Sequence, residues 1–444
     1  MRKEIVLNCK TLLLLYFGIL MLTAMIPSIK VMPPMDVLAM QCLMSLLCGF
    51  CISIHKYTSL NTLLPTIFFI NLILSILIRI MFMSHWNNPF GPVVFDALDY
   101  HIDASSYYKY SFFKFIEEYS NNSSLDDFGF TCILYIVYSL FEPELGIHVM
   151  LLINSLAVTI ACKYVYKIGK EHLTVETAKL AVAVVGVTSF SMTTSAKGLK
   201  ENFFILIVVS ASYFLLQYRR NGGLKNLIRF FIIALCSVFF RLAILPIFIL
   251  AYFSKFIQNS LKKRYFLIFV CLMAITIYIG LRIMNYLLIM RGFSDDIFLE
   301  HYENQYNDSA FGGLTNTITN LVFGILGAVP SFVSSPEKAQ YITLNNFTLL
   351  VSFFSGSLFI SGIYKILKNR SELFPLVVIS LLNILMITVM SFSFDYRYRF
   401  VIFPLIIIIS LYSLQDVSNR ESIMHKLYVV GSLALTVMYN CFLG

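Results

Sequence analysis

The sequence predicts an all-α, polytopic integral membrane protein, and three observations support that prediction. Of its 444 residues, 58% are hydrophobic and only 13% are charged, and the mean hydropathy is +0.79. A soluble domain has about a quarter of its residues charged, so this chain cannot cover a soluble surface of its size. Apolar runs of about twenty residues, long enough to cross a bilayer, recur along the chain. Basic residues gather between alternate runs, which is typical of cytoplasmic loops.

The charge balance does not indicate a nucleic-acid-binding protein, and the cysteines do not indicate a metal site. Lys and Arg number 33 against 24 Asp and Glu, giving a net charge of +9. Because the basic residues follow the topology of the runs, this surplus does not indicate nucleic-acid binding. Most of the nine cysteines lie inside apolar runs, where they predict small buried side chains. We therefore expect no metal site and no cofactor.

The apolar runs predict about thirteen spans. Single spans are expected over residues 11–29, 36–54, 63–84, 145–166, 178–194, 199–216, 266–284, 344–367, 373–390, 401–414 and 427–442. The stretch 227–257 is too long for one span. Arg241 and Pro246 interrupt it, which predicts two shorter helices that meet near Arg241. No small-x-small cleavage pattern follows the first run, which therefore predicts an uncleaved helix.

Two weaker segments are expected not to cross the membrane. Residues 128–141 are too few for a span, and 316–333 is interrupted by Gly324, Gly327 and Pro330. With both left out, the basic clusters all fall on the inner side of the membrane. These clusters are 2–10, 163–179, 219–229, 255–264, 365–370 and 420–426. The predicted topology therefore has a cytoplasmic N-terminus and an external C-terminus.

The whole chain, 1–444, is expected to form one membrane domain with two long outer loops, 85–127 and 291–316. Loops of this length are usually functional or disordered. In the first loop, Tyr108, Phe112 and Phe115 recur at helical spacing among charged residues. This pattern predicts an amphipathic helix that lies at the membrane surface.

Four groups of ionisable residues are predicted at the outer ends of spans. They are the acidic set Asp96, Asp99, His101 and Asp103; the turn Lys197-Gly198-Leu199-Lys200-Glu201; Arg241; and the run Asp395-Tyr396-Arg397-Tyr398-Arg399. Ionisable residues at membrane depth are costly and usually functional. Any one group is also explained by surface ion pairs, which contribute little. That explanation is weaker for four groups on one side of the membrane.

The chemistry of these groups suits a substrate with phosphate, sugar and lipid parts. The lysines and arginines match a phosphate or diphosphate, because the planar guanidinium binds phosphate oxygens with two donors. Tyrosines offer flat faces for sugar rings, and a carboxylate near Asp99 is suited to accept a proton from a hydroxyl. An ion pathway fits less well, because no span carries a regular polar stripe.

The order of these motifs resembles a known family. From residue 95 to 404 the chain reads "DYHIDASSYY", "KGLKE", "FFRLAILP" and "DYRYRFVIFP" in turn. It resembles the bacterial O-antigen polymerases (Wzy) and EpsG-like polysaccharide polymerases, which are similar to the GT-C membrane glycosyltransferases. The resemblance implies an enzyme of the bacterial plasma membrane. That enzyme joins undecaprenyl-diphosphate-linked repeat units into O antigen, the polymer of lipopolysaccharide, or into capsule at the outer face.

The resemblance also implies roles for individual residues. Arg241, Arg397 and Arg399 would contact the diphosphate, with Lys197 and Lys200 as secondary ligands. Glu201 would orient Lys200, while Asp395, Tyr396 and Tyr398 would support the site. Asp99, His101 or Asp103 would act as the catalytic base, with no metal. Asp126 and Asp127 follow the predicted surface helix in a polar stretch, and we expect them to be solvated.

Two other functions remain open from the sequence. A GT-C transferase that adds a single sugar from a polyprenyl phosphate would have the same composition. A flippase for the lipid-linked glycan would need a charged cavity open to both sides, whereas these charges are predicted on one side. Membrane lipids, a chain-length regulator and a flippase are the expected partners, and nucleic acid is not.

Overall fold

The computed structural model describes residues 35–91, 95–122, 127–260, 312–330, 344–390, 396–415 and 417–442. These ranges contain helices and no strand. The helices are α3 (Met35–Ile54), α4 (Leu60–Trp86), α5 (Phe95–Tyr107), α6 (Phe112–Asn122), α7 (Phe128–His172), α8 (Val175–Gly186), α9 (Ser189–Lys197), α10 (Glu201–Asn221), α11 (Leu224–Cys236), α12 (Leu245–Tyr252), α13 (Ser254–Ser260), α16 (Gly312–Leu326), α18 (Asn346–Lys368), α19 (Phe374–Met390), α20 (Tyr396–Phe400), α21 (Phe403–Ser413) and α22 (Asn419–Phe442).

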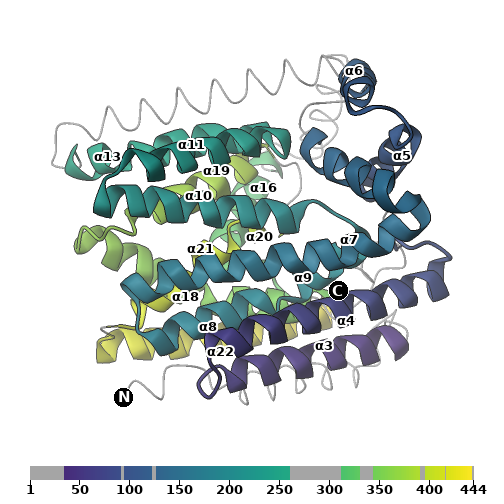
Figure 1. Cartoon of the computed structure of the whole chain (residues 1–444). Helices are drawn as coiled ribbons and strands as arrows, with labels where there is room; N and C mark the ends of the chain where they lie inside the picture. Colours follow the sequence, from purple (N-terminus) through teal and green to yellow (C-terminus); the bar gives the residue numbers. More distant parts are fainter. Residues whose placement is uncertain are drawn as a thin grey trace.

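The long helices lie side by side in a bundle, with α5 and α6 at one end (Figure 1). Five helical stretches in the described part are long and apolar enough to cross a membrane: Leu60–Trp86, Phe128–His172, Val175–Lys197, Glu201–Asn221 and Asn346–Lys368. The all-α, membrane-embedded class predicted from the sequence is therefore confirmed, whereas the number of thirteen spans is not. The predicted spans 11–29 and 266–284 lie outside the described residues, as does most of the second outer loop.

The run 178–194, predicted as one span, is divided into α8 and α9. Thr188 caps α9, because its side chain accepts a hydrogen bond from the Ser191 amide. Of the residues whose spacing predicted an amphipathic helix in the first outer loop, Phe112 and Phe115 lie in α6, whereas Tyr108 lies in the turn before it. A turn closed by Tyr110 N and Tyr107 O separates α5 from α6. One face of α6 carries the buried side chains of Phe115 and Tyr119, whereas Phe113 on another face is exposed.

The weak segment 128–141 is the first part of α7. Glu142 has a positive φ of 58° and Pro143 follows, so the helix kinks there. Phe130 packs against Phe203 near the start of α10, and the Tyr138 hydroxyl meets His101 of α5. Both parts of this segment therefore contact neighbouring elements at the end of the bundle that carries α5.

The predicted break in the stretch 227–257 is confirmed. Between α11 and α12 the chain makes two short 3₁₀ turns, Ser237–Phe239 and Leu242–Ile244. Arg241 stands between the turns in an extended conformation, with φ −169° and ψ 106°. In the segment 316–333, α16 ends at Leu326, and Gly327 follows with a φ of +104°.

The described basic clusters meet at the end of the bundle away from α5. Lys56 pairs with Glu176, and Gln415 donates to the His172 carbonyl. Arg219 donates to Ser254, and Gln258 donates to the Ser371 carbonyl. These contacts join loops that are distant in sequence, and they place the basic clusters and the α5–α6 region at opposite ends (Figure 1).

Candidate functional site

An ion pair joins the starts of α7 and α10 at the end of the bundle that carries α5. Lys200, directly before α10, pairs with Asp127, directly before α7. The Lys200 side chain is 8% exposed and that of Asp127 is 25% exposed. Tyr100 of α5 donates its hydroxyl to Asp127 at 3.1 Å, and the Lys200 ammonium lies 5.8 Å from the Tyr100 ring centre. Burial and the Asp127 charge raise the pKa of Tyr100, which therefore stays a donor.

Two arginines from distant segments lie beside this pair. Arg397 of α20 pairs with Asp96 of α5 at 2.9 Å. The Arg241 guanidinium lies over the Tyr398 ring at 4.0 Å and over the Phe204 ring at 5.6 Å. Within the described part of the chain, the Arg241 side chain has these ring contacts and donates no hydrogen bond. Stacking uses only the face of the group, so among the described residues the guanidinium N–H groups of Arg241 are not engaged.

The buried acid Glu201, the first residue of α10, lies among the three cations Lys200, Arg241 and Arg397. It is 3% exposed, and Arg397, Arg241 and Lys200 are all near enough for their charges to act on its carboxyl group. Its Oε2 atom is buried and has no hydrogen-bond partner among the described residues. Nearby cations offset part of the cost of burying a carboxylate. We call the whole set the charged cluster: Asp96, Tyr100, Asp127, Lys200, Glu201, Arg241, Arg397 and Tyr398.

The turn between α9 and α10 positions Lys200. Gly198 has a φ of +72° and closes α9, with its amide bonded to the Ser195 and Thr194 carbonyls. Arg79 of α4 holds the same turn through two hydrogen bonds to the Ala196 carbonyl, at 2.9 and 2.7 Å. A third bond joins Arg79 to the Ile147 carbonyl just after the α7 kink. Arg79 thereby fixes the turn against both α4 and α7.

The structure engages one predicted phosphate ligand, Arg399, at the end of α16. Arg399 is 2% exposed, and it donates to the carbonyls of Gly324 (2.7 Å) and Ile325 (3.2 Å) and to the Ser352 hydroxyl. It therefore caps the end of α16, where carbonyls lack helical partners. Lys197 is also buried, with its ammonium 5.9 Å from the Phe82 ring centre.

Within the described part of the chain, the predicted catalytic residues Asp99 and His101 form no ion pair with the cations of the cluster. Asp99 is exposed, whereas the face that α5 packs on the protein carries Ala97, Tyr100 and Ala104. His101 Nδ1 lies 2.9 Å from the Tyr138 hydroxyl. Burial, with a smaller effect of the Arg79 charge, lowers the pKa of His101 and favours a neutral ring. The Asp103 side chain is half-buried.

Asp127 is the functional candidate that sequence reasoning missed. We expected it to be solvated, but it accepts from both Lys200 and Tyr100. Its position directly before the apolar segment starting at Phe128 was the available signal, because the helix fixes the backbone beside Asp127 while the side chain does not cap that helix. Asp126, Asp395 and the Tyr396 side chain lie outside the described part.

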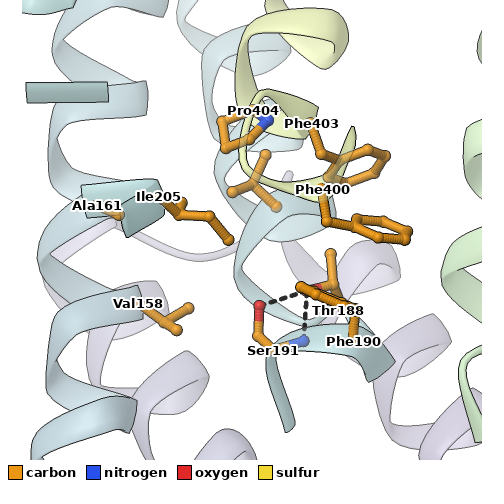
Figure 2. A pocket seen from close by; sticks show the side chains of 10 residues that line it. Val158, Ala161, Thr188, Phe190, Ser191, Ile205, Phe400, Phe403 and Pro404 are labelled. Carbon is orange, nitrogen blue, oxygen red and sulfur yellow. Dashed lines mark hydrogen bonds between the residues drawn. The ribbon is translucent and has the colours of Figure 1, made fainter. Parts of the chain in front are cut away.

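A small cavity lies inside the bundle, between α7, the α8–α9 break, α10 and the start of α21 (Figure 2). Thr188 and Ser191 form its polar side, with their hydroxyl oxygens 2.6 Å apart. Phe190, Phe400 and Phe403 contribute rings to the apolar side. It has room for roughly one water molecule, so it is not a substrate site.

The described residues offer no group of three side chains suited to a metal ion. Cys48 and Cys51 of α3 form a Cys-x-x-Cys pair, but both are fully buried and neither is in a disulfide. The Cys48 thiol donates to the Val187 carbonyl at 2.8 Å, so it contributes to packing between α3 and α8.

No protein-family model and no curated protein matches this chain.

Proposed function

We propose that this protein is a membrane glycosyltransferase that polymerises undecaprenyl-diphosphate-linked repeat units into a cell-surface polysaccharide, O antigen or capsule. The reaction would take place at the outer face of the bacterial plasma membrane. The observation that supports the proposal most is the charged cluster itself. Lys200, Arg241 and Arg397 come from three distant segments and lie around one buried carboxylate at one end of an apolar bundle.

The three cations suit a diphosphate leaving group. Arg241 is held flat by Tyr398 and its guanidinium N–H groups are not engaged among the described residues, so it is placed for two parallel bonds to phosphate oxygens. Lys200 and Arg397 each have a carboxylate partner, Asp127 and Asp96. An entering diphosphate competes with these carboxylates for the cations. The cations then stabilise the negative charge that develops as the leaving group departs.

Asp127 is the best-placed proton acceptor. Its partly exposed carboxylate already accepts a hydrogen bond from the Tyr100 hydroxyl. In the proposed reaction an acceptor hydroxyl attacks the anomeric carbon of the donor glycan. The bond from that carbon to the diphosphate oxygen breaks, and its electron pair stays on the diphosphate. The proton of the attacking hydroxyl passes to Asp127.

The test is product length in proteoliposomes supplied with the lipid-linked repeat unit. We expect the natural protein to give a ladder of polymers, and Arg241→Ala to give none while it still inserts. Arg241→Lys should restore little activity, because a point charge does not replace the planar guanidinium. Arg420→Ala is the control, since this exposed arginine lies at the other end of the bundle. A normal ladder from Arg241→Ala would remove this residue from the proposed site.

The same assay separates the two other candidate functions. A single added sugar would identify a single-sugar transferase. Movement of the lipid-linked glycan across the bilayer without a longer product would identify a flippase. Among the described charges, the three cluster cations and their partners occupy only one end of the bundle, and this arrangement favours a transferase. A chain-length regulator and a separate flippase are the proposed protein partners.

A further inference from the structure

A second group of cations lies at the opposite end of the bundle, on the surface between α7, α10 and α11. Lys163, Lys167 and Lys170 are spaced by four and three residues along α7, so they share one face of that helix. Arg229 of α11 is near enough for its charge to act on Lys167, as do the charges of Lys163 and Lys170. Like charges at this spacing destabilise a helix, and a bound anion would relieve the repulsion.

Three aromatic rings lie beneath these cations. The Lys167 ammonium lies 5.0 Å from the Tyr164 ring centre and 5.1 Å from that of Tyr213. The Arg229 guanidinium lies over the Phe214 ring at 5.4 Å. The Tyr164 ring is in turn 5.4 Å from the Tyr213 ring. These rings orient the cations by cation–π attraction without neutralising their charge.

No carboxylate within the described ranges forms an ion pair with these four cations. Glu171 is the nearby acid, and its charge acts on Tyr213. Both of its oxygens accept hydrogen bonds from Gln217, at 2.7 and 2.8 Å, and Arg220 lies at 3.5 Å. Glu171 is thus already occupied, and the group of four cations keeps its positive charge.

We propose that Lys163, Lys167, Lys170 and Arg229 bind the headgroup of an anionic phospholipid that carries two phosphodiester groups. Lys163, Lys170 and Arg229 are exposed, and an arginine with several lysines is the usual donor set for phosphate oxygens. Lys163 and Lys170 are seven residue steps apart, which is about 10 Å along the helix, a length that suits two phosphates better than one. Basic sites between membrane helices bind such headgroups.

The experiment counts lipids that remain bound to the purified full-length protein by native mass spectrometry. The protein is prepared in phosphatidylcholine containing either diphosphatidylglycerol or phosphatidylglycerol at equal total charge, with and without excess inorganic phosphate. The test variant combines Lys163→Gln, Lys167→Gln, Lys170→Gln and Arg229→Gln. The control removes four exposed cations from the same end that lie on other helices: Lys255→Gln, Lys368→Gln, Arg420→Gln and Lys426→Gln.

We expect the natural protein and the control to retain diphosphatidylglycerol in preference to phosphatidylglycerol. The test variant should retain about tenfold less of it. The proposal is overturned if the test variant retains the lipid fully, or if the control loses as much. It is also overturned if inorganic phosphate displaces the lipid, because the site would then bind a free anion. If the fourfold variant does not insert, the pair Lys163→Gln and Lys170→Gln replaces it, with a partial loss expected.

Discussion

The three cations of the charged cluster differ in what they contact. Lys200 and Arg397 each pair with a carboxylate, whereas Arg241 stacks on Tyr398 and Phe204. A ligand must displace Asp127 or Asp96 to reach the first two, and that displacement costs part of the binding energy. We therefore expect Arg241 to contribute most to diphosphate affinity.

Asp127 and Asp99 give opposite predictions for the catalytic carboxylate. Asp127→Asn should reduce the rate of glycosyl transfer by about 10²–10⁴-fold, the usual contribution of a general base. Asp99→Asn should leave the rate near that of the natural protein, because Asp99 is exposed and away from the packed face of α5. Initial rates at matched protein levels provide the measurement. An inactive Asp99→Asn beside an active Asp127→Asn would reverse the assignment.

The pKa of His101 predicts a dependence of stability on pH. Burial and the Arg79 charge lower this pKa from its ordinary value of about 6.5. The unfolded state then binds the proton more readily, so His101 contributes stability above pH 6.5 that is lost as the pH falls. Thermal unfolding from pH 7.5 to 5 should therefore show a steeper loss for the natural protein than for His101→Asn. Equal slopes would show that His101 does not titrate in this way.

At the scale of helices, two buried arginines close helix ends inside the bundle. Arg79 binds the carbonyl of Ala196 at the end of α9, and Arg399 binds those of Gly324 and Ile325 at the end of α16. A cation at a helix C-terminus is favoured by the helix dipole as well as by hydrogen bonds. Arg79 therefore stabilises the C-terminal end of α9, and Arg399 stabilises that of α16.

Loss of Arg399 should destabilise the fold and not only the reaction. Arg399→Gln leaves carbonyls of α16 and the Ser352 hydroxyl short of donors, and each buried unpaired group costs about 1–3 kcal/mol. We expect a lower midpoint of thermal unfolding in detergent for Arg399→Gln and no change for Arg420→Gln. If Arg399→Gln left the midpoint unchanged but abolished diphosphate binding, Arg399 would be a diphosphate ligand and not a structural residue.

The close packing of α18 on α21 gives a prediction with an internal control. A Cβ atom on Gly362 would clash with the Ile409 carbonyl oxygen, whereas one on Gly431 of α22 meets nothing within 4 Å. Gly362→Ala should lower thermal stability because two backbones must separate. Gly431→Ala should be neutral or stabilise by about 0.5–1 kcal/mol through helix propensity. Equal unfolding midpoints for the two variants would contradict this packing.

The sequence identified helices well but not every helix end. Apolar runs located α4, α10 and α18, because hydropathy reports burial in a bilayer. The break between α8 and α9 was missed because Thr188 forms it through a hydrogen bond, which hydropathy does not detect. In α20, Arg397 and Arg399 are two residues apart and point to different sides of the helix. For this reason one joins the charged cluster and the other caps α16.

At the scale of the whole molecule, the separation of two kinds of charge was predictable. Positive-inside reasoning grouped the basic clusters, and those in the described part do meet at one end. It also grouped the four ionisable motifs, of which Asp96, Lys200, Arg241 and Arg397 come together. The choice of acid was not predictable, because it depends on which face of α5 packs inward.

Cysteine labelling of an otherwise cysteine-free protein in cells tests the orientation. Ser106→Cys, in the exposed part of α5, should react with an impermeant reagent added outside. Asn221→Cys and Asn369→Cys, both exposed at the basic end, should react only after permeabilisation. Ser105 is a poorer choice, since its hydroxyl is buried. Reaction of Asn221→Cys from outside would place the basic end in the wrong compartment.

Equilibrium binding of a short-chain polyprenyl diphosphate to the purified protein tests the charged cluster most directly. It measures the site without requiring an acceptor glycan or turnover. We predict that Arg241→Ala weakens binding by about 10–100-fold, the cost of losing one or two hydrogen bonds to a charged group. Lys200→Gln should weaken it less, and Arg420→Ala should leave it unchanged. Equal affinities for the natural protein, Arg241→Ala and Lys200→Gln would contradict a diphosphate site at this cluster.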